Sequence, residues 1–105
     1  MDTRVFELQA NLCKVFSNPK RLQLLCLLKD GEKSFAELQT ATGCSKANLS
    51  QHLTVLRDRG VITGRRDGQF LYFSVANPKI TEACELMHQV LCDQLEAHQQ
   101  AAGQL

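Results

Sequence analysis

The chain has 105 residues, of which 44% are hydrophobic and 22% charged, as in one ordinary globular domain that buries a core without disulfide or metal support. Its formal net charge of +1 gives no overall attraction to nucleic acid and neither supports nor excludes DNA binding, so any basic surface must be local. No apolar run is long enough to cross a bilayer, the first residues lack a signal-peptide pattern, and the five dispersed cysteines favour a reducing compartment, so we expect a cytoplasmic protein.

Two apolar helices are predicted at the start of the chain. The first is expected from Thr3 to Phe16, with Asp2 or Thr3 as its N-cap. The second is expected from Pro19 to about Lys29, because Asn18 can cap it and proline suits a first helical turn. This second helix is apolar almost all round, which indicates a central position.

A helix-turn-helix is predicted next. Ser34 and Glu37 have the spacing of a capping box, which starts a short third helix over Phe35 to Thr42. Gly43 ends that helix, and Ser45 caps a fourth helix that continues until Gly60. Two helices joined by a tight turn containing glycine are typical of this motif.

The fourth helix has two different faces. Leu49, His52, Leu53 and Leu56 repeat at the spacing of one buried stripe. The opposite face is small and polar, which suits a helix that lies in a groove of DNA. We expect the DNA contacts of this helix to be Lys46, Ala47, Ser50, Gln51, Thr54 and Arg57.

A basic β-hairpin is predicted after the fourth helix. The strands are expected at Ile62 to Arg66 and Gln69 to Val75, joined by a turn at Asp67-Gly68. Alternation points one set of side chains inward (Ile62, Leu71, Phe73 and Val75) and another outward (Arg65, Phe70 and Tyr72). Such a hairpin is typical of a wing that contacts phosphates or a minor groove, through Arg65, Arg66 and Gln69.

A long last helix is expected from Pro78 to about His98, followed by a frayed tail over residues 99–105. Its apolar stripe exceeds what one small core needs, and so does that of the first helix. We therefore expect dimerisation through the first and last helices, which would place two reading helices about 34 Å apart on an inverted-repeat operator. The expected fold, over residues 1–105, is one mainly α (α+β) winged helix-turn-helix domain with five helices and a two-stranded hairpin.

Three sequence strings carry a family resemblance: FSNPKRLQLLCLL, CSKANLSQHLTVLRDRGVI and DGQFLYFSV. With their order in the chain, they resemble the ArsR/SmtB family of bacterial winged-helix repressors over residues from about Ala10 to Cys92. The resemblance implies a homodimeric repressor that binds double-stranded operator DNA and releases it when an inducer binds. We expect no cofactor and no enzymatic activity, since the chain has no C-x-x-C pair and no recognisable nucleophile site.

The metal-binding patterns of two family branches are missing from this sequence. Arsenic sensors of the family place a C-x-C pair after a Glu-Leu in the third helix, whereas Glu37-Leu38 is followed here by Gln39-Thr40-Ala41. The zinc and nickel sensors place an Asp-x-His and a His-x-x-His on the last helix, where this chain has only His88 and His98. The sequence therefore supports neither the arsenic site of the third helix nor the zinc or nickel site of the last helix.

The chain is most similar to the dithiol branch of the family, which includes BigR, SqrR and HlyU and senses persulfides or oxidants. Members of that branch have one cysteine in the second helix and another near the end of the last helix, where this chain has Cys26 and Cys92. The resemblance implies that reactive sulfur species or oxidants join the two thiols through a disulfide or polysulfide and release DNA. His88, one turn before Cys92, could hydrogen-bond that thiol.

An alternative inducer is a soft metal ion. Cys84, His88 and Cys92 recur at four-residue spacing on the last helix and could bind such an ion, with Cys13 as a further ligand. Against this, Cys13 and Cys84 lie on apolar stripes, where cysteine commonly serves as a small packing residue. Cys44, in the turn of the helix-turn-helix, is expected to be incidental.

Overall fold

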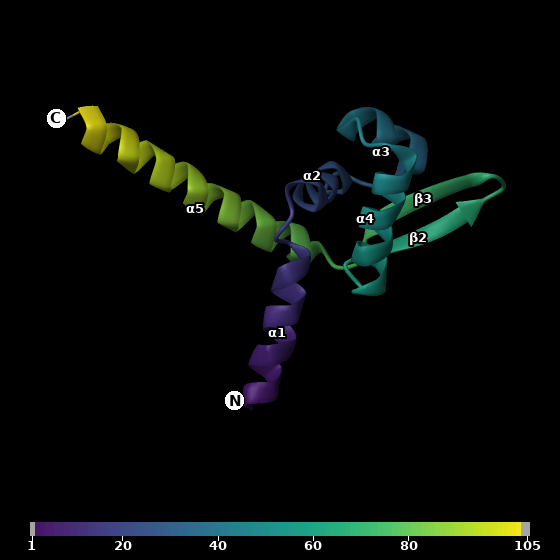
Figure 1. Ribbon diagram of the computed structural model, residues 1–105, viewed down its shortest axis with the longest axis horizontal. Helices are drawn as coiled ribbons and strands as arrows, with labels where there is room; N and C mark the ends of the chain where they lie inside the picture. The colour runs from purple at the N-terminus through teal and green to yellow at the C-terminus, as the bar shows by residue number, and fades with distance from the viewer. Residues whose placement is uncertain (1, 104–105) are drawn as a thin grey trace.

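The structure is a computed structural model and describes residues 2–103 of the chain. Five helices and a three-stranded antiparallel sheet follow one another along the chain, which confirms the predicted winged helix-turn-helix. In Figure 1, α1 and α5 project away from the body formed by the other elements. The elements are α1 (Thr3–Val15), α2 (Pro19–Leu28), β1 (Lys33–Ser34), α3 (Phe35–Thr42), α4 (Lys46–Asp58), β2 (Ile62–Asp67), β3 (Phe70–Val75) and α5 (Pro78–Gly103).

Side-chain caps fix where most of the helices begin. The Asn18 side chain accepts hydrogen bonds from two backbone amides of α2, and Ser45 accepts one from the amide of Asn48 in α4. Ser34 and Glu37 form the predicted capping box at the start of α3. Between α3 and α4, Gly43 has a φ of 69°, a left-handed conformation that suits glycine. These caps hold the helix-turn-helix in its tight form.

The core lies where α2, α3 and α4 meet the sheet. Leu24, Leu25 and Leu28 of α2 are all buried, which confirms the central position of this helix. The buried stripe of α4 consists of Leu49, Leu53 and Leu56, whereas His52 is only half-buried. The remaining buried apolar side chains are Val15, Leu38, Val61, Ile62 and Phe73.

The sheet has one more strand than predicted. β1 has only two residues, and it pairs with β3, which lies between β1 and β2. The hairpin itself is confirmed, but its turn lies at Gly68 and Gln69, because Asp67 pairs with Phe70. This one-residue shift leaves every side chain on its predicted face, since alternation along each strand is unchanged. Ile62 and Phe73 are accordingly buried, and Arg65 and Phe70 are exposed.

The last helix is longer than predicted. α5 continues to Gly103, so the expected end near His98 was wrong; residues 104 and 105 of the expected tail lie outside the described residues. Helix α1 ends at Val15, one residue before the predicted Phe16. Among residues 2–103, no helix combines the length and apolar character that crossing a membrane would require.

Candidate functional site

The exposed face of α4 carries the helix residues predicted to contact DNA. Leu49, Leu53 and Leu56 anchor one side of this helix in the core, which leaves the other side free. All six predicted side chains are exposed. We call this surface the recognition face, and it consists of Lys46, Ala47, Ser50, Gln51, Thr54 and Arg57.

The recognition face is continuous with the wing, which is the β2–β3 hairpin. A shallow hollow of about 620 Å³ separates the first turns of α4 from the wing. Lys46 and Ser50 line it on the helix side, and Gln69 lines it on the wing side. With Ala47, which also lines the hollow, four of the predicted contacts meet at one surface, although they come from two elements.

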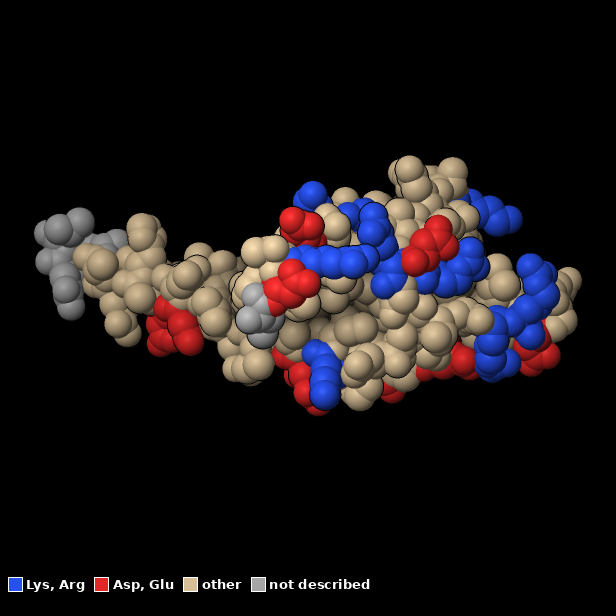
Figure 2. All heavy atoms as spheres, turned by 90° about the horizontal axis from the view of Figure 1, so that it is seen from below, with Lys and Arg blue, Asp and Glu red and all other residues tan. Residues whose placement is uncertain are grey.

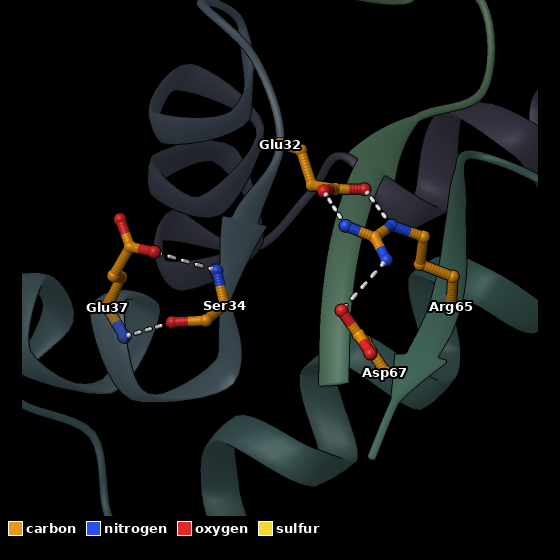
Figure 3. Close-up of polar contacts among 5 residues, drawn as sticks. All are labelled: Glu32, Ser34, Glu37, Arg65 and Asp67. Atoms are coloured by element: carbon orange, nitrogen blue, oxygen red, sulfur yellow. Dashed lines mark hydrogen bonds and ion pairs between the residues drawn. The ribbon is translucent and has the colours of Figure 1, made fainter. Parts of the chain in front are cut away.

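The two neighbouring wing arginines differ in their surroundings. The Arg65 guanidinium donates hydrogen bonds to both carboxylate oxygens of Glu32, at 2.8 and 2.6 Å (Figure 3). It also stacks over the ring of Tyr72, 4.5 Å from the centroid. Hydrogen bonding from Arg65 holds the pKa of Glu32 below its usual value. Arg66 is exposed, and within residues 2–103 it has no acidic partner at ion-pair distance.

Basic side chains gather on the body and the wing of the molecule rather than on the arm of α5 (Figure 2). Figure 2 shows Lys and Arg concentrated over the body and the wing, whereas the projecting arm of α5 has none in view. After Lys79, the only charged side chains of α5 apart from histidines are acidic. The near-neutral chain is therefore polarised, with its local basic surface on the helix-turn-helix side.

The thiols lie in different surroundings. Cys26 on α2 is exposed, and Cys84 on α5 packs partly buried against the core. Burial raises the pKa of the Cys84 thiol, and the nearby Cys26 adds to the rise. One turn beyond Cys26, Lys29 forms an ion pair of 3.0 Å with Glu85 of α5. In one protomer, the part of α5 that packs beside Cys26 is therefore the part that carries Cys84.

Cys92 lies farther toward the C-terminal end of α5, a helix that projects away from the body of the molecule (Figure 1). It is exposed, and eight residues of helix place it about 12 Å beyond Cys84. Cys13, expected to pack, is exposed on α1, and Cys44 is half-buried in the turn of the helix-turn-helix. Among the described residues no group of three or more Cys, His, Asp or Glu could hold a metal ion, so the alternative metal set is not assembled within one protomer.

The projecting helices carry uncovered apolar side chains. They lie on α1 and on the middle of α5, and several are more than half exposed. Two separate helices with such surfaces are typical of an interface between subunits. These side chains are Val5, Phe6, Leu8 and Leu12 on α1, and Leu86, Met87, Val90, Leu91 and Leu95 on α5.

One polar residue of the site carried no signal in the sequence. Glu32 is a charged residue in a short loop, and a solvated position would have been the ordinary expectation. Its contact with Arg65 depends on β1, a two-residue strand too short to produce a periodic pattern. The position of Glu32 beside the wing could have been predicted only from the pairing of β1 with β3, in which Lys33 lies opposite Phe73.

Comparisons with known proteins agree with this arrangement. Residues 18–63 match the family model described as "Bacterial regulatory protein, arsR family". The chain is 36% identical to "Transcriptional activator HlyU" of Vibrio cholerae over 81 residues, which cover 77% of this chain and 75% of HlyU. A solved structure described as "Reduced HlyU" has a TM-score of 0.77 at 32% identity and covers 86% of this chain and 95% of that one.

Two further relatives add a named repressor and a named dimer. "Biofilm growth-associated repressor" of Xylella fastidiosa is 35% identical over 94 residues, 90% of this chain and 82% of that protein. The solution structure of Mb0332 from Mycobacterium bovis, described as a homodimeric winged helix-turn-helix DNA-binding domain, has a TM-score of 0.81 at 30% identity. It covers 91% of this chain and 89% of that fragment.

Proposed function

The chain belongs to the ArsR family of bacterial regulatory proteins, and from that premise we propose that it is a homodimeric repressor whose DNA binding is controlled by Cys26 and Cys92. As a member of this family it is a transcriptional regulator rather than an enzyme. The observation that carries the proposal is the continuous surface formed by the recognition face and the wing around one hollow. We place its action in the bacterial cytoplasm, where operator DNA is found.

DNA binding would divide between the two elements of that surface. The recognition face would enter a major groove, where Ser50, Gln51 and Thr54 read base edges and Lys46 and Arg57 neutralise phosphates. Arg66 and Gln69 would contact the adjacent backbone or minor groove from the wing, beside Arg65. The hollow between Lys46 and Gln69 would lie along the phosphate backbone between these grooves.

Dimerisation would bury the apolar faces of α1 and α5. A relative of the same fold is described as homodimeric, which supports this assembly. A two-fold axis through these helices would place two recognition faces about 34 Å apart, so the operator would be an inverted repeat. Repression is the proposed direction of control, since one relative is named a repressor; another is named an activator, which makes direction a point for experiment.

The proposed signal is a bridge between Cys26 and Cys92. Both thiols are exposed, as reaction with a soluble oxidant requires. Hydrogen peroxide would take two electrons and two protons from the pair and leave one disulfide and two waters. A polysulfide would supply the sulfur atoms of the bridge, take up the two thiol protons and release two molecules of hydrogen sulfide. A relative solved in a form described as reduced supports a redox-dependent state.

The bridge would require movement of α5, and this movement supplies the mechanism. A disulfide needs Cα atoms within about 7 Å of each other. Cys84, rather than Cys92, lies on the part of α5 that packs against α2. Joining Cys26 to Cys92 would therefore shift α5 along α2, disturb the dimer interface and change the spacing of the two recognition faces.

Peptide mapping after oxidation tests the proposed bridge. The protein is treated with sodium tetrasulfide, blocked with iodoacetamide, digested and examined by mass spectrometry. The proposal predicts a linked pair of peptides that contain Cys26 and Cys92, with or without added sulfur mass, and the same pair missing from a Cys92→Ser variant. A link from Cys26 to Cys84 in place of Cys92 would contradict it. A metal ion retained in the native mass spectrum, with no linked peptides, would instead favour the set Cys84, His88, Cys92 and Cys13.

A further inference from the structure

Arg65 of the wing contacts three other residues of its own protein. Its Nε and one terminal nitrogen donate to the two carboxylate oxygens of Glu32, at 2.8 and 2.6 Å. The other terminal nitrogen lies 4.0 Å from Asp67, and the flat face of the guanidinium lies over Tyr72. Because a bidentate pair uses the guanidinium edge that would otherwise grip a phosphate, Arg65 is occupied in this conformation.

Glu32 joins the wing to the helix-turn-helix. It directly precedes β1, whose Ser34 begins α3 through the capping box with Glu37 (Figure 3). The Glu37 amide donates to Ser34 Oγ at 3.1 Å, and the Ser34 amide donates to a Glu37 carboxylate oxygen at 3.2 Å. The segment from Glu32 to Ser34 is therefore fixed to α3 at one end and to β2 of the wing at the other.

The ion pair crosses the whole sheet. β1 pairs with β3, and β3 pairs with β2, so Glu32 reaches Arg65 over the middle strand. Arg65 lies directly opposite Tyr72 of that middle strand. The contact thus fixes the outer strand of the wing relative to the segment that leads into the helix-turn-helix.

We propose that Glu32 is a positioning residue for DNA binding, which holds Arg65 so that the wing keeps its angle to the recognition face. This inference rests on the proposed function and refines the role of Arg65 within it. Arg66 and Gln69, next to or within the turn of the wing, are the groups that meet DNA, and Arg65 acts through the geometry of the hairpin. Neighbouring arginines thereby serve different purposes, since alternation sends their side chains to opposite faces of the strand.

The Glu32→Gln variant separates positioning from simple electrostatics. It removes a negative charge near the DNA surface, so electrostatics alone predicts tighter binding. Positioning predicts weaker binding, by about three- to thirtyfold, because an exposed pair contributes modestly and a dimer uses two wings. The probe is a DNA duplex selected from a random library by the parent protein, and affinity is measured by fluorescence anisotropy. Asp58→Asn is the matched control, because it makes the same charge change at an exposed residue of α4 that forms no ion pair with Arg65, and its affinity should not fall.

A charge swap tests whether Arg65 acts through Glu32. Arg65→Glu alone should weaken binding at least as much as Glu32→Gln. The double variant Glu32→Arg with Arg65→Glu restores the pair at the parent net charge, and its affinity should return to within about threefold of the parent. If Arg65 held a phosphate directly, the double variant would stay as weak as Arg65→Glu, which would overturn the inference.

Hydrogen exchange provides a readout that needs no DNA. In Glu32→Gln, backbone amides of β2 and β3 near the turn should exchange faster than in the parent, while those of α2 and α4 stay protected. Unchanged protection in the wing would overturn the inference even if DNA binding fell. Failure of the parent protein to bind any selected duplex would count against the proposed function, and faster exchange in the wing would still support the positioning role.

Discussion

At the scale of single residues, Lys46 and Gln51 share the recognition face and should affect binding differently. If Lys46 neutralises a phosphate as proposed, Lys46→Ala removes that contact in each subunit, so affinity should fall for all duplexes alike. The slope of log affinity against log salt should become shallower by roughly two per dimer. Gln51→Ala should leave that slope unchanged and reduce the preference for the selected duplex over a scrambled one by about tenfold. An unchanged salt slope in Lys46→Ala would mean that this lysine does not contact a DNA phosphate.

The residues that could be predicted from the sequence are those on periodic elements. Lys46, Ser50 and Gln51 were placed on an exposed face because Leu49 and Leu53 mark the buried one, and the structure agrees. Glu32 was missed, since its position depends on pairing across the sheet. The surroundings of Cys84 were only partly predictable. Its apolar stripe indicated packing, but its proximity to Cys26 required the angle between two helices.

At the scale of elements, the capping box at the start of α3 should contribute measurably to stability. Ser34→Ala removes the hydrogen bond to the Glu37 amide and should lower the free energy of unfolding by about 1 kcal/mol. Urea denaturation followed by circular dichroism measures the change. Ser50→Ala is the matched control, because Ser50 lies on the exposed middle of α4 and makes no cap. Equal stability in the two variants would argue against a structural role for the box.

Local signals predicted most elements because each signal acts over a few residues. Asn18-Pro19, Ser34 with Glu37, and Gly43 fix helix ends through hydrogen bonds and backbone conformation that need no distant partner. The predicted turn of the wing was wrong by one residue, since Asp67-Gly68 and Gly68-Gln69 both contain the glycine that suits a two-residue turn, and the pairing of Asp67 with Phe70 decided between them. The sequence did not predict β1, because a two-residue strand forms through pairing with a neighbouring strand and has no periodic pattern of its own. The end of α5 was predicted too early, because the polar residues after His98 carry no local signal that the helix continues.

At the scale of the whole molecule, a single protomer has an extended shape that leaves the apolar faces of α1 and α5 exposed, and a second copy would cover them. The described chain measures 59 × 40 × 23 Å, and both projecting helices would be stabilised by a second copy. Val90→Glu would bury an uncompensated carboxylate from each subunit in the proposed interface, so the dimer dissociation constant should rise by at least about a hundredfold. Sedimentation velocity should show a dimer for the parent and a monomer for the variant.

The control for that prediction is another apolar residue on a different surface. Phe70 is exposed on the wing, away from the proposed interface, so Phe70→Glu should remain a dimer. A Val90→Glu variant that stays dimeric at the same concentration would place the subunit interface elsewhere.

The most direct test of the account is operator affinity measured before and after treatment with polysulfide, for the parent, Cys26→Ser and Cys92→Ser. The parent should lose about a hundredfold in affinity, which corresponds to a coupling of about 3 kcal/mol between the thiols and the DNA surface. Both serine variants should bind as the parent does before treatment and keep that affinity afterwards. Cys13→Ser is the control: it should bind as the parent does before treatment and lose affinity afterwards, as the parent does. If either Cys26→Ser or Cys92→Ser still releases DNA as the parent does, control of this regulator by a Cys26–Cys92 bridge is contradicted.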